Sequence, residues 1–290
     1  MADASSDDTL TAVAAIQREL PPGWRPFMRE ADLTRTALAT GLNALAKANH
    51  MQGGFYNQAF FNISIGLERL LKLIFLIEHG LTHAGAFPSE EELRNRFRHD
   101  LKRLFEEAIA IRHRLQDKGQ KFQWELVDED LAARIVNVLA EFARATRYYN
   151  LDYLVGARRI GRDPLEAWAQ DVASYLVKQY PATRRVRDEK WAAEAEQLLK
   201  GHVILLQETE TGQPIRTVRE SALHGRMGDW IQQKATFHTA TVVRYLTEIL
   251  TVLNYQAGPG AVLELPHLWE YFTVFGNPDS LLKYRKTFLI

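Results

Sequence analysis

The segment of residues 57–79 is apolar on nearly every side, and it constrains the fold more than any other stretch of the chain. Its apolar side chains recur at helical spacing from Phe60 to Ile77. A helix that is apolar almost all round needs neighbours on every side, so we expect it at the centre of a helical bundle. The segment also carries the charged residues Glu68, Arg69 and Lys72, which a membrane-spanning helix would not tolerate. Glu68 and Lys72 stand four positions apart, in the favourable orientation for an ion pair.

Helical periodicity also dominates the rest of the chain. Asp32 is a candidate N-cap for one helix, and Ser89 with Glu92 forms a capping box for another. The helices expected besides the central one cover residues 33–48, 89–115, 128–149, 165–179, 188–199, 230–253 and 265–274. Two runs rich in β-branched residues flank a turn-like segment within residues 202–220, which indicates a hairpin. We predict an all-α protein with at most one small β-hairpin.

The chain divides into three predicted parts. Residues 1–20 are expected to be disordered or to form a short N-terminal helix. Residues 21–156 are predicted to form an antiparallel helical bundle. Glycines, a proline and arginines interrupt the pattern near residues 156–164, and residues 157–290 follow as an α-rich C-terminal region without a predictable role. The sequence leaves open whether this region folds separately or completes the bundle.

Composition excludes several classes of function. The 36 basic and 36 acidic residues balance, so binding to nucleic acid or an anionic membrane would need a local patch. Without cysteine, the chain forms no disulfide, thiolate metal site or cysteine nucleophile. The first ten residues lack the basic start and apolar stretch of a signal peptide, so we expect a cytoplasmic protein with no membrane partner.

Motifs for common cofactors are also missing from the sequence. It contains neither the glycine-rich loops that bind nucleotide phosphates nor the serine nucleophile motif of hydrolases. His79 and His83 are four positions apart, but zinc needs three or four converging ligands. We therefore expect no cofactor and no metal site.

Three stretches within residues 55–154 resemble the HEPN superfamily, whose small four- to five-helix domains occur in prokaryotic toxins, defence proteins and nucleotidyltransferase partners. "GLERLLKLIFLIEHG" is similar to that family's central helix, with Glu68 and Lys72 at the matching positions, "HDLKRL" to its His-Asp-Leu helix start, and "RATRYYN" to the end of its last helix. The resemblance implies a HEPN-like bundle that binds RNA or a nucleotide in a defence or toxin–antitoxin system. It also implies a homodimer, or a nucleotidyltransferase-type or antitoxin partner.

Many HEPN proteins are ribonucleases whose signature is an arginine followed, after four to six residues, by a histidine. Arg94 and His99 fit this spacing. A histidine can move the 2′-hydroxyl proton near neutral pH and an arginine can hold the phosphate, so no metal is required. On one continuous helix, five residues place the two side chains about 140° apart. Both therefore face one phosphate only if a second copy contributes or the helix begins later than Ser89.

A metal-independent ribonuclease using Arg94 and His99 is thus an alternative to a binding protein. A non-catalytic protein–protein interaction module is another. Residues 94–114 carry an excess of four positive charges, which favours phosphate binding, and a neighbouring tyrosine would stack on a base. The same charges would also suit a solvated face on which Arg103 pairs with Glu107 and Lys102 with Glu106. The candidate binding residues are Arg96, Arg98, Arg103, His113, Arg144, Arg147 and Tyr148.

Overall fold

A computed structural model describes residues 21, 23–96, 99–156, 161–199, 201–258, 260–285 and 287–288, so the prediction for residues 1–20 lies outside the described residues. Helices account for most of the described chain. Its strands are confined to β1 (Gln207–Glu208) and β2 (Pro214–Ile215), which pair antiparallel with Gln207 opposite Ile215. The prediction of an all-α protein with one small hairpin is confirmed.

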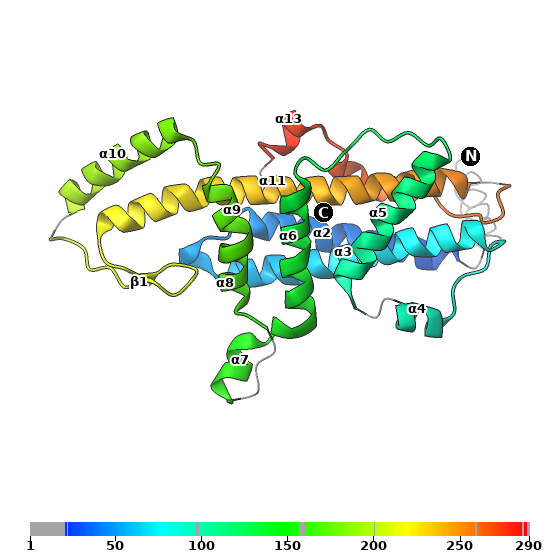
Figure 1. Cartoon of the computed structure of the whole chain (residues 1–290), viewed down its shortest axis with the longest axis horizontal. Coiled ribbons are helices and arrows are strands. Elements are labelled where there is room, and N and C mark those ends of the chain that lie inside the picture. The colour runs from blue at the N-terminus through cyan, green and yellow to red at the C-terminus, as the bar shows by residue number, and fades with distance from the viewer. Residues whose placement is uncertain are drawn as a thin grey trace, which may run out of the picture.

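Three long helices run side by side along the longest axis of the molecule (Figure 1). They are α2 (Trp24–Leu45), α3 (Gly54–Thr82) and α11 (Val218–Gln256). The apolar side chains of α3 are buried along most of its length, and the helix contacts both α2 and α11. The predicted central position of this helix is confirmed, because an element apolar on nearly all sides is stable only when other helices cover it.

Two glycines allow α2 and α3 to approach closely. A Cβ atom on Gly41 of α2 would lie 2.5 Å from the Ile63 side chain, and one on Gly66 of α3 would lie 2.7 Å from the Leu38 side chain. Both distances are shorter than a carbon–carbon contact permits. The two helices therefore pack with their backbones near each other at these two positions.

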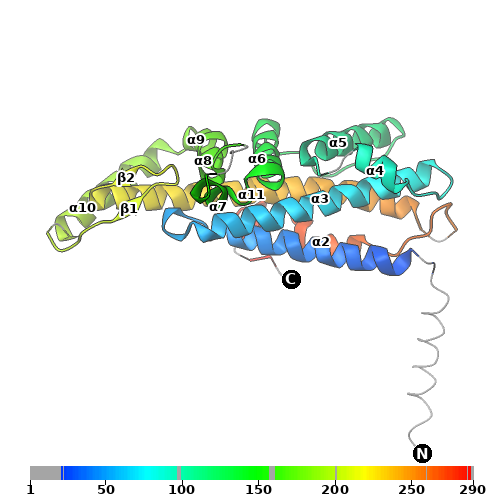
Figure 2. The same ribbon diagram turned by 90° about the horizontal axis from the view of Figure 1, so that it is seen from below.

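Short helices form a second layer across the long ones (Figure 2). Figure 2 shows this layer on one face of α3 and α11, with α2 on the other. The π-helical turn η2 extends α6, the turn η3 joins α8 to α9, and α7 projects from the body of the molecule (Figure 1). The bounds are α5 (Leu101–Asp117), α6 (Glu129–Glu141), η2 (Phe142–Thr146), α7 (Tyr149–Leu154), α8 (Pro164–Trp168), η3 (Ala169–Ala173) and α9 (Ser174–Val177).

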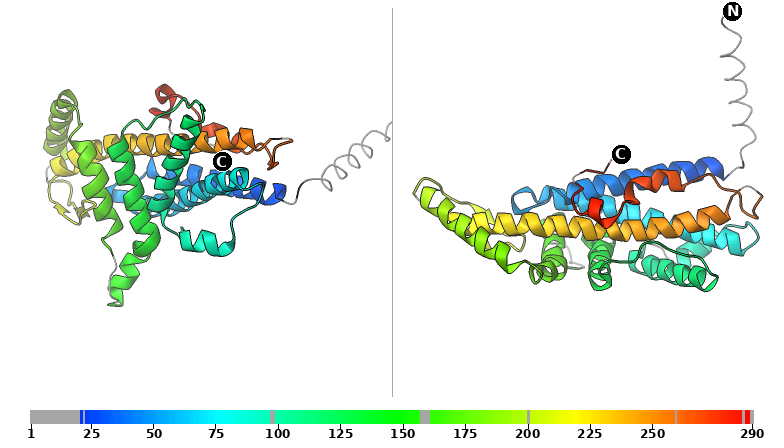
Figure 3. Two further views of the ribbon diagram at one scale, coloured as in Figure 1. Left: turned by 45° about the vertical axis from the view of Figure 1, so that its right-hand side comes forward. Right: turned by 90° about the horizontal axis from the view of Figure 1, so that it is seen from above.

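The C-terminal part of the chain shares the core of the bundle. Helix α11 packs on both α2 and α3, and its buried side chains belong to the same apolar cluster as theirs. The Asn43 side chain on α2 exchanges two hydrogen bonds with the Phe288 backbone, of 2.9 and 2.7 Å. Figure 3 shows, from above, the C-terminal segments on the same side of α11 as α2. The remaining elements are η1 (His50–Gln52), α4 (Glu90–Arg96), α10 (Ala182–Leu199), α12 (Trp269–Phe272), η4 (Thr273–Phe275) and α13 (Asp279–Leu282).

The predicted continuous helix over residues 89–115 is wrong. Its start is confirmed, because Ser89 and Glu92 form the reciprocal hydrogen bonds of a capping box. However, α4 ends at Arg96 and α5 begins at Leu101. The Asp100 side chain accepts a hydrogen bond from the Arg103 backbone at 3.1 Å, and this N-cap starts the second helix.

The start of α2 was also predicted incorrectly. The helix begins at Trp24, and Asp32 lies inside it, where its carboxylate pairs with Arg35 at 2.9 Å instead of capping the backbone. The helix start expected near Asp128 is confirmed, and the Asp128 side chain caps α6 by accepting a hydrogen bond from the Leu131 backbone at 2.9 Å. Within the described ranges, no helix has the length and apolar character that crossing a membrane requires.

Candidate phosphate-binding pocket

A pocket of about 280 Å³ lies where the start of α5 meets the end of α6 and η2. The N-terminus of α5 carries the partial positive charge of a helix start, which favours an anion nearby. The lining residues are His99, Asp100, Leu101, Lys102, Asn137, Ala140, Glu141 and Arg144. Two of them, His99 and Arg144, are residues that the sequence analysis selected, and the structure brings them to one pocket.

His99 is held from the centre of the bundle by Glu68 on α3. The Nδ1 atom of His99 lies 2.9 Å from Glu68 Oε1, and the Lys72 ammonium lies 2.6 Å from the same oxygen, which confirms the predicted ion pair. Burial would raise the pKa of the Glu68 carboxyl, but the hydrogen bonds from Lys72 and His99 outweigh it and hold this pKa below its ordinary value. An anionic Glu68 therefore orients the imidazole, which is itself 80% exposed.

Two cations at the pocket have no side-chain partner among the residues that the structure describes. Lys102 and Arg144 are exposed, and neither makes a hydrogen bond or an ion pair through its side chain with any residue that the structure describes. The Glu141 carboxylate on the pocket wall is already neutralised by the Arg162 guanidinium at 3.1 Å and also accepts the Arg162 backbone N–H at 2.8 Å. Asp100 is the other acidic residue of the lining, and its Oδ1 accepts the Arg103 backbone N–H, so Lys102 and Arg144 leave the lining an excess of one positive charge.

The pairing expected for a fully salt-bridged face is not the one observed. Glu107, proposed as the partner of Arg103, instead accepts a hydrogen bond from Arg114 at 3.0 Å. Arg112 does not belong to the surface at all, because its side chain is 1% exposed and bonds Glu125 and Glu248. The excess of positive charge near the pocket is thus smaller than a count along the sequence indicates, because Arg94, Arg112 and Arg114 all pair with acidic side chains.

Arg94 and His99 contact different acidic side chains. The Arg94 guanidinium lies 2.6 Å from Glu90 within α4 and does not line the pocket. Because the chain begins a new helix after α4, the angle expected for one continuous helix does not apply to this pair. Arg98 and the side chain of Arg96 lie outside the described residues.

The other predicted binding residues are spread over a wider surface. Arg103 lines a neighbouring pocket of about 630 Å³, and His113 is exposed about 15 Å further along the α5 axis. The Arg147 guanidinium lies over the Phe61 ring at 5.1 Å. Tyr148 is 64% exposed at the base of α7. Tyr148 thus follows the pocket residue Arg144 by one helical turn, whereas His113 is remote from it.

Sequence reasoning missed a second polar cluster, formed by His50, Glu210 and His224. These residues come from the start of η1, the hairpin turn and α11, so only the fold brings them together. One signal was available, because Arg219 and His224 repeat the arginine-to-histidine spacing of Arg94 and His99. As with Arg94 and His99, the two side chains have different partners: the Arg219 guanidinium bonds Glu189 at 2.7 Å, whereas His224 contacts Glu210.

Comparisons of the chain with family models, with curated proteins and with solved structures find no match. The HEPN relationship therefore stays a prediction that rests on three short stretches of sequence. The function proposed below is argued from the geometry of the pocket.

Proposed function

We propose that the chain binds single-stranded RNA, or a nucleotide, through a phosphate held in the pocket between α5, α6 and η2. The observation that carries the proposal is the pair of cations, Lys102 and Arg144, which have no partner in the described part of the chain and lie beside the N-terminus of a 17-residue helix. Arginine and lysine supply most phosphate contacts in RNA complexes, and a helix start adds to the attraction. The His99 imidazole supplies a further hydrogen-bonding group on the pocket wall.

The size of the pocket favours a strand over an isolated nucleotide. A volume of about 280 Å³ is at the small end for a site that encloses a whole ligand. It suits one phosphate and its sugar, with the bases lying outside. Tyr148 would provide an exposed aromatic surface for such a base one turn beyond Arg144.

Fluorescence anisotropy with a labelled short single-stranded RNA at low salt tests this proposal. We expect binding by the natural protein and an affinity lower by about tenfold or more in the variant Lys102→Ala/Arg144→Ala, because each lost contact is charge-assisted. Arg35→Ala is the matched control, since Arg35 lies on α2 and already pairs with Asp32. No binding at low salt, or equal binding by the double variant, would refute the proposal.

A second candidate function is metal-independent RNA cleavage, and the 2.9 Å contact between Glu68 and His99 favours it. A histidine held at Nδ1 by a carboxylate can accept the 2′-hydroxyl proton at Nε2, and the carboxylate then stabilises the imidazolium. The 2′ oxygen would bond to phosphorus and the 5′ oxygen would leave, taking a proton from solvent. Arg144, which lines the same pocket, is better situated than Arg94 to balance the phosphate charge.

We also propose that the chain forms a homodimer through α7. Leu151 and Leu154 on this projecting helix are 61% and 77% exposed. Apolar side chains grouped on a protrusion are typical of an interaction surface. Since η2 connects α7 to α6, pairing of two copies there would bring two phosphate pockets near each other. An antitoxin or nucleotidyltransferase, the partners that the HEPN resemblance implies, would be the alternative occupant.

A further inference from the structure

The cluster of His50, Glu210 and His224 gathers three potential metal ligands at one end of the molecule. Their ligand atoms all lie within 4.8 Å of one another. The Nε2 atom of His224 is 2.8 Å from Glu210 Oε2, and the His50 ring meets the His224 ring edge-on with 4.8 Å between centroids. Each ligand comes from a different element, η1, the hairpin turn and α11, so an ion here would tie these three elements together.

The cluster is not satisfied by its own hydrogen bonds. The Nε2 atom of His50 is buried and has no hydrogen-bond partner among the described residues. A structural role for the His224–Glu210 pair would explain those two side chains but would leave this nitrogen unpaired. A buried polar atom of this kind is unfavourable unless something binds it. A cation shared by the three side chains provides that partner.

We infer that His50, Glu210 and His224 bind a divalent transition-metal ion, with zinc the best fit. Two imidazoles and one carboxylate, with a fourth position left open, form a typical ligand set of zinc sites that bind water or substrate. Calcium and magnesium prefer sets made of oxygen atoms. The inference is independent of the phosphate pocket, since the two sites share no lining residue.

The separations between the ligand atoms suit this ion. Tetrahedral zinc with bonds of about 2.0–2.1 Å holds its ligand atoms about 3.3 Å apart. The separations here extend from 2.8 Å between His224 and Glu210 to no more than 4.8 Å across the cluster. Small side-chain rotations would therefore bring all three atoms onto one ion. On binding, the metal takes the place of the proton that His224 and Glu210 share.

A second layer of side chains fixes the carboxylate. The Tyr56 hydroxyl donates a hydrogen bond of 3.3 Å to Glu210 Oε1, and the Gln232 amide in turn donates to the Tyr56 hydroxyl. With Oε1 bonded to the Tyr56 hydroxyl, the Oε2 atom of Glu210 is directed at His224. Residues that orient a metal-binding carboxylate in this manner commonly raise metal affinity.

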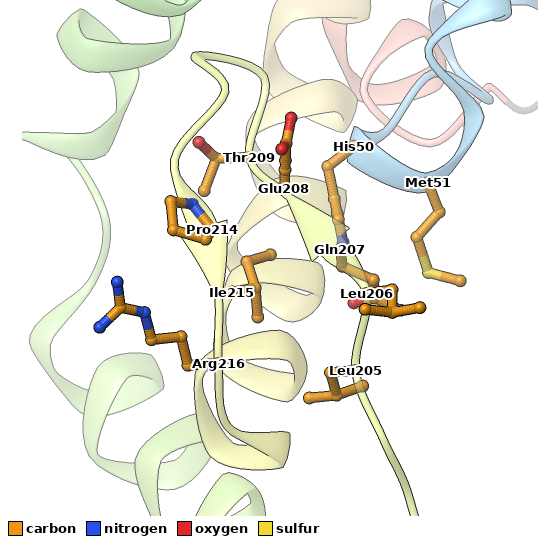
Figure 4. Close-up of a pocket in the computed structure, with 10 residues that line it drawn as sticks. All are labelled: His50, Met51, Leu205, Leu206, Gln207, Glu208, Thr209, Pro214, Ile215 and Arg216. Carbon is orange, nitrogen blue, oxygen red and sulfur yellow. The ribbon is translucent and has the colours of Figure 1, made fainter.

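A pocket of about 860 Å³ adjoins the cluster at His50. Figure 4 shows His50 at the edge of this pocket, close to Gln207, with Thr209 and Arg216 among the other lining residues. His50 thus belongs both to the cluster and to the pocket wall. An ion bound by His50 would adjoin the pocket, from which water or a small ligand would occupy the fourth position.

Zinc binding by the full chain tests the inference. The protein is stripped with a chelator, equilibrated with zinc chloride, passed through a desalting column and analysed for metal. We expect one zinc ion per chain, and isothermal titration should show affinities lower by about 100-fold or more for His50→Ala, His224→Gln and Glu210→Gln. Tyr56→Phe should lower the affinity by about tenfold. Cobalt substitution should produce the visible absorption of a tetrahedral site in the natural protein.

The control is His83→Ala, which removes a histidine stacked on His79 at 3.8 Å and should leave zinc binding unchanged. Circular dichroism of each metal-free variant shows whether it folds. His50→Ala is decisive if Glu210→Gln does not fold, because His50 lies on the short turn η1 outside the long helices. Absence of stoichiometric zinc in the natural protein, or full retention of zinc by His50→Ala, would overturn the inference.

Discussion

Glu68 and His99 lie 2.9 Å apart, although 31 residues separate them in the sequence. Glu68 belongs to the central helix α3, whereas His99 directly precedes the Asp100 cap of α5. The contact therefore fixes the start of a surface helix to the central helix of the bundle. The Glu68 side chain is only 18% exposed, so solvent and salt weaken this hydrogen bond less than one between two fully exposed groups.

If the pocket cleaves RNA, His99 and Glu68 should have unequal effects on the rate. In an assay with EDTA present, His99→Ala should lower the cleavage rate by about 100-fold or more, because a positioned proton acceptor is lost. Glu68→Gln should have a smaller effect, since it weakens only the orientation of the imidazole. His113→Ala, at the far end of α5, serves as the control. Equal cleavage by the natural protein and His99→Ala would exclude this mechanism.

The salt dependence of RNA binding should report the contribution of Arg144. Each phosphate contact with a single strand contributes about 0.7 to the slope of log affinity against log salt concentration. Arg144→Ala should therefore reduce that slope by about 0.7. The measurement is anisotropy over a series of salt concentrations, with Arg35→Ala as reference. A slope that stays the same in Arg144→Ala would place the phosphate elsewhere.

Charged residues on α7 should prevent self-association. We expect light scattering to give a dimer for the natural protein and a monomer for Leu151→Asp/Leu154→Asp, because burying an unpaired carboxylate in an apolar interface is unfavourable. Leu206→Asp is a suitable control, since that side chain is 94% exposed beside the hairpin, away from α7. A natural protein that is monomeric at micromolar concentration would contradict the proposed interface.

Glu248 should be important for stability. It accepts hydrogen bonds from the backbones of Gln123 and Trp124 at 2.5 and 3.0 Å, and it faces the buried Arg112 guanidinium at 3.4 Å. Glu248→Ala should lower the free energy of unfolding by about 3 kcal/mol, because the buried Arg112 guanidinium loses one of its two acidic partners. Urea denaturation measures the change. Glu106→Ala, an exposed acidic residue on α5, should alter stability by less than about 0.5 kcal/mol. A similar effect of both variants would contradict this account.

His238 should make the fold less stable in mild acid. Burial lowers its pKa from 6.5 to about 4, against partial compensation by Asp128 and Asp279, while Lys234 and Lys283 reinforce the shift. The unfolded chain thus gains a proton before the folded protein does, so stability is complete above pH 6.5 and falls as the pH decreases toward 4.

The loss between pH 7 and pH 5 should be about 2 kcal/mol, measured by urea denaturation at each pH. His238→Gln should remove this part of the pH dependence, since glutamine does not titrate. Retention of the same difference by the variant would assign it to other groups.

Local patterns in the sequence were sufficient to predict α3, the cap at Ser89, the start of α6 near Asp128, and the hairpin. The break between α4 and α5 was missed because Leu93, Phe97 and Leu101 keep helical spacing across it. Apolar periodicity reports which residues face a core, but it does not show where the backbone changes direction. The Asp100 cap was the available signal, and it lay inside the "HDLKRL" stretch on which the HEPN resemblance depends.

The sites were less predictable than the helices. His99 and Arg144 were each selected, but the crossing of α5 and α6 that brings them to one pocket depends on packing between distant segments. Arg112 was counted among the surface cations, yet it lies between the rings of Phe122 and Tyr245 at 4.2 and 4.3 Å. No local pattern distinguishes a buried arginine from an exposed one when its acidic partners come from elsewhere in the chain.

The contact between α3 and α11 has a consequence for biosynthesis. The ribosome completes α3 long before it reaches residue 218, and at about 5–20 residues per second the interval is roughly 10–30 s. During this time the apolar side chains of α3 lack the helix α11, which covers part of them in the folded protein. We expect chaperones that bind exposed apolar segments to bind the nascent chain at α3. A premature stop codon before α11 should yield a fragment that aggregates.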